Sequence, residues 1–209
     1  TQIKEVENES FAYIGNHSHS HDYLTKFNFE KFVEDIERSI NIFNNKLGYN
    51  PSFFSYPFGE YNLEQKNYIS KNFEFAFGQH SGVIDLNKDK YELPRFPINE
   101  KYGELKRFKE VISYLPLQYK NIKPENKFMN ADENPPKMIV EFFKDQKNLN
   151  NINCFSNEGS KWRKTNIVID NNLLKVNFAE KFIERRGRIN CSLKDESGWR
   201  FSGFQFVQN

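Results

Sequence analysis

The chain has 209 residues, of which 37% are hydrophobic and 16% aromatic, including 22 Phe. This length suits one large domain or two small ones, and the large aromatic rings can build a core from a modest number of apolar residues. The net charge of +2, from 30 basic and 28 acidic residues, provides no basic surface for nucleic acid. No apolar stretch approaches the ~18 residues of a membrane helix. We therefore expect a globular protein without a membrane span and without a nucleic-acid partner.

Strand-like and helix-like patterns alternate in the first half of the chain. Apolar runs predict short strands at residues 11–15, 51–57, 73–77 and 93–98. Helical spacing of apolar residues predicts helices at residues 29–47, 63–71 and 105–114. The first of these helices has Asn28 as a potential N-cap and Gly48 as a left-handed end. The alternation predicts parallel βαβ units and an α/β fold, whose functional sites usually follow strand ends.

The pattern changes in the second half. Residues 121–136 are polar and contain three prolines, which predicts a linker. Beyond it, period-two alternation predicts strands at residues 166–170, 173–178, 188–193 and 199–207. The last strand shifts its alternation, and a bulge at Ser202-Gly203 would restore its register. The expected organisation is an α/β domain over residues 1–120, the linker, and an antiparallel β-sandwich or curved sheet over residues 137–209.

The two cysteines are Cys154 and Cys191, and neither lies in a Cys-x-x-Cys pair. A thiolate zinc site is therefore not expected. Both fall in the β-rich half, where each can serve as a small buried apolar residue. A disulfide between them is the less favoured interpretation.

Three histidines alternate over residues 17–21, directly after the first predicted strand. His17 and His21 are four apart, so they can face the same way if the loop makes a helical turn. Neutral imidazoles bind borderline divalent metals such as zinc, cobalt or nickel. An extended comb of all three histidines, or a polar surface loop without metal, are the alternatives.

Two more segments follow predicted strand ends. Residues 54–62 read as a strand ending in a turn, and a backbone N–H group after Pro57 can help to hold a developing oxyanion. Arg95 stands between two prolines, where a fixed guanidinium can orient a carboxylate through two hydrogen bonds. A purely structural turn and an exposed ion pair are the respective alternatives.

In this order, the three segments resemble the polysaccharide deacetylase family, also called carbohydrate esterase family 4. Residues 17–21 are similar to the metal motif His-Ser/Thr-x-x-His, which implies His17 and His21 as metal ligands, with Ser18 supporting the loop. The implied metal is divalent, zinc first and cobalt or nickel as alternatives.

The other segments resemble further motifs of the family. Residues 54–59 resemble the wall of its substrate groove, which implies that Tyr56 and Phe58 bind substrate and that the N–H of Phe58 serves the oxyanion. Phe58 stands where most members have Tyr. Residues 94–97 resemble the motif whose arginine orients the catalytic aspartate, which implies this role for Arg95. Residues 77–82 also resemble this family, and His80 is expected to contact substrate.

The resemblance covers roughly residues 11–98. It implies a partial (β/α) barrel of the polysaccharide deacetylase type, followed by the small β-sandwich. The implied activity is metal-dependent hydrolysis of N-acetyl groups on a polysaccharide or oligosaccharide, with cell-envelope or exported glycans as substrates. A non-catalytic carbohydrate-binding protein, or a scaffold with a degenerate deacetylase fold, is the alternative.

The sequence departs from the family at its N-terminal end. The family begins with an Asp-Asp pair that supplies a general base and a third metal ligand, and no Asp precedes Phe11 here. The expectation is an incomplete site with little activity by itself. An open sheet edge would also need covering, by a missing N-terminal segment or by self-association.

Overall fold

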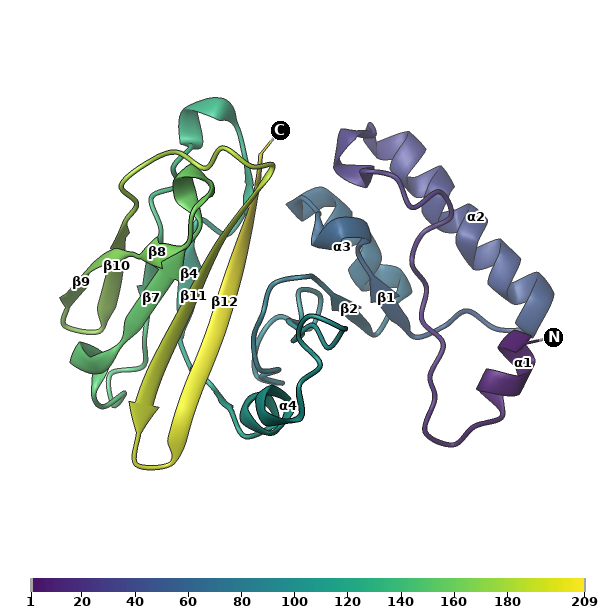
Figure 1. The fold of residues 1–209 in the computed structure, drawn as a ribbon. Coiled ribbons are helices and arrows are strands. Elements are labelled where there is room, and N and C mark those ends of the chain that lie inside the picture. The colour runs from purple at the N-terminus through teal and green to yellow at the C-terminus, as the bar shows by residue number, and fades with distance from the viewer. Residues whose placement is uncertain (1, 209) are drawn as a thin grey trace. The chain divides into compact units, whose positions relative to one another are not determined.

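The structure, a computed structural model, describes residues 2–208 (Figure 1). The chain divides into two compact units. The first comprises the described residues up to Gln79 together with Lys88–Leu93, and the second comprises His80–Asn87 and the residues from Pro94 onward. The second unit therefore begins well before the boundary predicted at residue 120. No helix in the described part of the chain is long and apolar enough to cross a bilayer.

The first unit contains three helices and two strands. In chain order they are α1 (Gln2–Glu7), α2 (Phe29–Leu47), β1 (Phe53–Ser55), α3 (Leu63–Asn72) and β2 (Phe75–Phe77), with 3-10 turns at Leu24–Lys26 and Pro57–Gly59.

Helix α2 forms as its sequence predicts. The Asn28 side chain accepts a hydrogen bond from the Lys31 N–H, and Gly48 ends the helix with a φ of 86°. The buried face of α2 carries Phe32 and Ile36, which join the core of the first unit. Burial of this face stabilises the helix more than its local propensity does.

Four segments of the first unit run parallel in sequence order. β1 pairs with β2, Asn16 forms a single bridge with Phe54, and Leu93 forms one with Phe77. Consecutive strands of a (β/α) barrel have this order. The described residues form only a two-stranded sheet with a bridge on each side, so the barrel stays a prediction.

The prediction of a buried strand at residues 11–15 is wrong. Phe11 and Tyr13 are 81% and 78% exposed, and backbone pairing begins only at Asn16. An apolar run becomes a buried strand only where a neighbour pairs with it and a second layer covers it. The strand predicted at residues 93–98 is likewise reduced to the bridge at Leu93.

The described residues of the second unit form one α-helix and ten strands. They are α4 (Leu105–Ile112), β3 (Leu115–Pro116), β4 (Asn121–Lys123), β5 (Phe128–Met129), β6 (Ile139–Glu141), β7 (Asn153–Ser156), β8 (Arg163–Lys164), β9 (Asn166–Asp170), β10 (Leu173–Asn177), β11 (Arg186–Asp195) and β12 (Gly198–Gln208), with 3-10 turns at Ala131–Glu133, Leu149–Asn151 and Glu158–Ser160.

These strands form two sheets that share one core, in agreement with the predicted sandwich. One sheet has the order β4-β6-β10-β9, and the other has the order β3-β12-β11-β7-β8, with β5 beside β12. Val140 and Leu174 of the first sheet share a core with Ile189 and Phe204 of the second. The pairings are antiparallel except that β3 and β5 run parallel to β12.

The predicted linker at residues 121–136 belongs to this sandwich. β4 pairs with β6 and β5 pairs with β12, so both segments are held in sheets. The prolines that suggested a flexible connection stand between short strands, where they suit turns.

The predicted bulge beside Gly203 is absent. β11 and β12 pair in one unbroken register and form the long hairpin of Figure 1. The alternation shifts because β12 is covered on both faces: Phe204 joins the sandwich core, whereas Phe201 stacks on Tyr114. Glycine is required at position 203 because a Cβ there would overlap the backbone carbonyl oxygen of Ser81.

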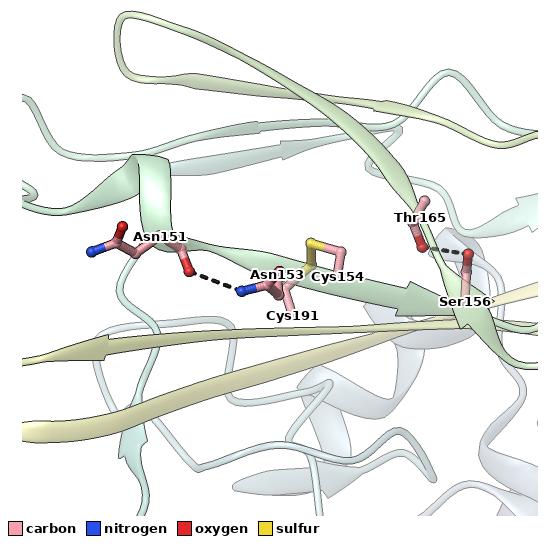
Figure 2. The surroundings of a disulfide bond; sticks show 6 residues. All are labelled: Asn151, Asn153, Cys154, Ser156, Thr165 and Cys191. Carbon is pink, nitrogen blue, oxygen red and sulfur yellow. Dashed lines mark hydrogen bonds between the residues drawn. A yellow bond between two sulfur atoms is a disulfide. The ribbon is translucent and has the colours of Figure 1, made fainter.

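Cys154 of β7 and Cys191 of β11 are joined by a disulfide (Figure 2), which corrects the favoured interpretation of two separate thiols. The two residues stand directly opposite each other across the strand pair, and both are buried. Beside them, the hydroxyl groups of Ser156 and Thr165 share a hydrogen bond of 2.5 Å. The pairing depends on the register of two strands that are 37 residues apart in sequence, which spacing alone does not reveal.

Removing this cross-link should destabilise the chain. We expect the double variant Cys154→Ala/Cys191→Ala to lose about 2–4 kcal/mol of unfolding free energy, because the disulfide restricts the unfolded chain. Urea denaturation of parent and variant measures the difference. If the unreduced, denatured parent reacted with two equivalents of a thiol reagent, the disulfide assignment would be contradicted.

Candidate metal centre

The rings of His17 and His21 lie together at the end of a parallel segment. Their centroids are 4.8 Å apart and their planes are inclined by 72°. Both side chains are exposed, so ions in solution can reach them. Two imidazoles can adopt such a separation around one tetrahedral metal ion, whose Zn–N bonds are about 2.0–2.1 Å long.

The orientation of His17 is set by a backbone carbonyl group. Its Nδ1 lies 2.6 Å from the carbonyl oxygen of Ser55, the last residue of β1. In the tautomer that donates from Nδ1, the lone pair of Nε2 is free for a metal. Ligating histidines commonly have a second-sphere partner of this kind, which fixes both tautomer and ring direction.

Aromatic rings form one side of the site. The ring of Phe58 lies 5.0 Å from that of His21 in an edge-to-face arrangement. The ring of Tyr23 stacks on Phe58 at 4.1 Å. This pair presents an apolar surface beside the imidazoles.

Backbone strain is concentrated in the same place. Ser18, His21 and Phe58 have φ values of 66°, 56° and 58°. Residues other than glycine seldom occupy this region, which costs of order 1 kcal/mol or more each. Such strain persists only where surrounding contacts impose it, and it is typical of ligand-binding sites.

Hydrogen bonds within the histidine loop hold this conformation. The Oγ of Ser18 accepts from the N–H of His21 at 3.0 Å, and the N–H of Ser18 donates to Oδ1 of Asn16 at 3.0 Å. Asn16 is fully buried, and its Nδ2 donates to Ser39 of α2 at 2.9 Å. The loop is therefore anchored in the core of the first unit.

Imidazole is a suitable ligand type for a divalent metal, but a pair of imidazoles provides fewer ligands than most metal sites have. Within residues 2–208, no three or more His, Cys, Asp or Glu side chains form a group that could hold a metal ion. Catalytic zinc normally has three protein ligands. The described residues therefore bring together fewer side chains than a catalytic zinc site normally has.

The N-terminal part of the chain, which contains the histidine loop, is similar to a known family. Residues 1–76 match the family described as polysaccharide deacetylase. A peptidoglycan-N-acetylglucosamine deacetylase from Bacillus cereus is 38% identical over 58 residues, which are 28% of this chain and 21% of that protein. The matched part of the chain thus spans about a fifth of this relative.

One residue that the deacetylase resemblance assigned to the substrate groove is not available there. The side chain of Tyr56 is 1% exposed and packs against Phe54 and Tyr61 in the core. Burial, followed by the nearby negative charges of Asp89 and Glu92, raises the pKa of its phenol well above the ordinary value. The expected contact of the Tyr56 side chain with substrate is therefore wrong, because alternation along this segment turns residues 54 and 56 inward.

Arg95 and His80, the other deacetylase candidates, belong to the second unit. The N–H of Arg95 donates to the carbonyl oxygen of His80 at 3.0 Å, which pairs the two segments. Arg95 is exposed. Burial lowers the pKa of Arg188, and the positive charges of Arg186 and Arg95 lower it further. The catalytic and substrate-binding roles expected of Arg95 and His80 stay predictions.

Sequence patterns did not single out the polar residues that anchor the loop. Asn16, Asp35 and Ser39 are all buried. Asp35 and Ser39 occupy the otherwise apolar face of α2, one turn apart. Polar side chains at core-facing helical positions were the available signal, since buried polar groups need specific partners.

Proposed function

We propose that this chain takes part in the metal-dependent removal of N-acetyl groups from a polysaccharide or oligosaccharide. The observation that carries the proposal is the convergence of His17 and His21, with His17 tied to the Ser55 carbonyl oxygen, inside the segment that matches the deacetylase family. By analogy with the name of the Bacillus cereus relative, the proposed substrate is a glycan that contains N-acetylglucosamine.

The proposed roles follow from the positions of the residues. His17, through Nε2, and His21 would hold a divalent metal, zinc first and cobalt or nickel as alternatives. When bound, such a metal lowers the pKa of a coordinated water and polarises a carbonyl oxygen. The Phe58 and Tyr23 rings offer an apolar face that suits one side of a sugar ring. The backbone N–H of Phe58 is proposed to donate to the developing oxyanion.

Further elements of the proposal concern the surroundings of this site. The four parallel segments are proposed to be consecutive strands of a (β/α) barrel, with the histidines at the carboxyl ends where such folds build their sites. Arg95 is proposed to orient a catalytic carboxylate, and His80 to contact substrate. Because residues 2–208 provide only two grouped ligands, we expect weak zinc binding and slow turnover by this chain alone.

Acetate release from N-acetylglucosamine oligomers tests this function. We expect slow release by the parent chain that depends on added zinc and is lost in His17→Ala, because the variant has one imidazole left. Glu34→Gln, at an exposed position of α2, serves as the control and should match the parent. Equal release by the parent and His17→Ala would contradict a role of the histidine pair. Rapid release would contradict the expectation that the described ligand set is incomplete.

Carbohydrate binding without catalysis is the second candidate function. It is favoured by the exposure of Trp162 and Trp199, at 52% and 47%, in the β-sandwich unit. Exposed aromatic rings can stack on sugar faces. If the oligomers quench tryptophan fluorescence but release no acetate at any zinc concentration, this second function is supported over the first.

A further inference from the structure

A buried carboxylate of α2 binds the middle of the histidine loop. Asp35 is 8% exposed. Its Oδ1 accepts a hydrogen bond from the N–H of His19 at 2.9 Å, and its Oδ2 accepts one from the N–H of Ser20 at 3.0 Å. Both oxygens of this carboxylate are therefore engaged by backbone groups that lie between His17 and His21.

These bonds compensate for a loop conformation that is unfavourable by itself. Ser18 and His21, on either side of the bound N–H groups, have left-handed backbone angles. Hydrogen bonds to an ionised acceptor are roughly twice as strong as neutral ones. A carboxylate that receives two of them from adjacent residues can hold a strained loop that a neutral side chain would hold less firmly.

Helix α2 contacts the loop a second time, one turn further along. Ser39 lies four residues after Asp35, and its Oγ accepts from Nδ2 of Asn16, the residue before His17. Side chains four apart share one face of a helix. The same helix face thus fixes the loop on both sides of His17, while the Ser55 carbonyl group orients its ring.

We propose that Asp35 is a positioning residue that sets the spacing of His17 and His21 for a metal ion. This inference rests on the proposed metal function. Asp35 does not coordinate the metal in this arrangement, because both of its oxygens face the backbone N–H groups of the loop. Its contribution is the geometry of the ligand pair.

The test compares Asp35→Asn with Glu34→Gln in the 209-residue chain. Both changes replace a carboxylate by its amide on α2, but Glu34 is exposed and accepts none of these bonds. The asparagine amide group would face one loop N–H without being able to accept from it. We expect Asp35→Asn to weaken zinc binding about tenfold or more, as is common for supporting residues of metal sites, in an NMR titration of the histidine signals. Glu34→Gln should bind zinc like the parent.

A second readout does not depend on the metal. Without zinc, solvent exchange of the His19 and Ser20 amide protons should accelerate in Asp35→Asn and stay unchanged in Glu34→Gln. If the parent binds no zinc, the proposed metal function fails, and faster exchange of these two amides still supports the anchoring role. If both zinc affinity and amide exchange are unchanged in Asp35→Asn, the inference is overturned.

A further variant covers the case in which Asp35→Asn does not fold. Asp35→Glu keeps the charge and both acceptor oxygens but moves them outward by one methylene group. We expect intermediate zinc affinity and intermediate exchange of the same amides. Parent-like values for both quantities in this variant would also overturn the inference.

Discussion

Replacing His17 or His21 by Ala should weaken zinc binding by more than about 100-fold, beyond the 10–100-fold loss typical of supporting residues. Each ring provides one of the two imidazoles that converge in the described site. One imidazole in water holds zinc poorly, because the remaining ligands must then be solvent molecules. Isothermal titration at millimolar zinc can follow the loss even though the parent affinity is expected to be weak.

His19→Ala is the matched control for these variants. His19 lies in the same exposed loop, and its backbone N–H bond to Asp35 does not require the imidazole. We expect His19→Ala to bind zinc like the parent. If it lost as much affinity as His17→Ala, the histidines would act as an extended comb, and the proposed two-ligand arrangement would be wrong.

Lys66→Met should destabilise the first unit substantially. Nζ of Lys66 lies 2.6 Å from Asp89 and 3.4 Å from Glu92, and its side chain is 9% exposed. Burial alone lowers the pKa of Lys66, but the charge of Glu92 and the hydrogen bond with Asp89 outweigh it, so the pKa is raised. Without the Lys66 cation, the neighbouring carboxylates of Asp89 and Glu92 lose the positive charge that they share.

We expect a loss of about 2–3 kcal/mol of unfolding free energy in urea denaturation, below the 3–5 kcal/mol of fully buried pairs, because Asp89 is partly in water. The raised pKa means that this stabilisation is present at neutral pH and is lost as the pH rises through the folded-state pKa of Lys66. Lys71→Met, at an exposed site in the last turn of the same helix, should cost less than about 1 kcal/mol. Equal urea midpoints for Lys66→Met and the parent would show that the ion pairs of Lys66 do not stabilise the fold.

This ion-pair network matters for the candidate site because it secures a parallel segment. Lys66 belongs to α3, whereas Asp89 and Glu92 lie in the segment just before Leu93, which forms the bridge with Phe77. Tyr61 also donates to Glu92 at 2.9 Å. Loss of the cation should therefore loosen this segment first.

Locally encoded features were predictable from the sequence. α2 begins after Asn28 and ends at Gly48 as expected, because cap residues and helical periodicity act within a few turns. β9 has the predicted bounds, since period-two alternation and turn residues also act locally. His17 and His21 face each other as expected, but the helical turn on which this expectation depended does not form, because Ser18 and His21 have left-handed backbone angles.

Features that depend on distant partners were not predictable. The disulfide requires that Cys154 and Cys191 meet across two paired strands. Residues 11–15 would form a strand only if a neighbouring segment paired with them, and backbone pairing starts at Asn16. The motif suggested that Tyr56 lines the groove, but the motif does not determine which side chains face the core. Packing places the Tyr56 side chain in the core. The anchoring of the loop by Asp35 depends on how α2 packs beneath it.

Zinc K-edge X-ray absorption of the zinc-loaded chain can identify the atoms that coordinate the metal. We expect two imidazole nitrogens in the first coordination sphere, with light atoms from solvent as the remaining ligands. The spectrum should be unchanged in His19→Ala and should lose its imidazole scattering in the His17→Ala/His21→Ala double variant. A first sphere without imidazole, or one that is identical in the double variant, would contradict the histidine pair as a metal site.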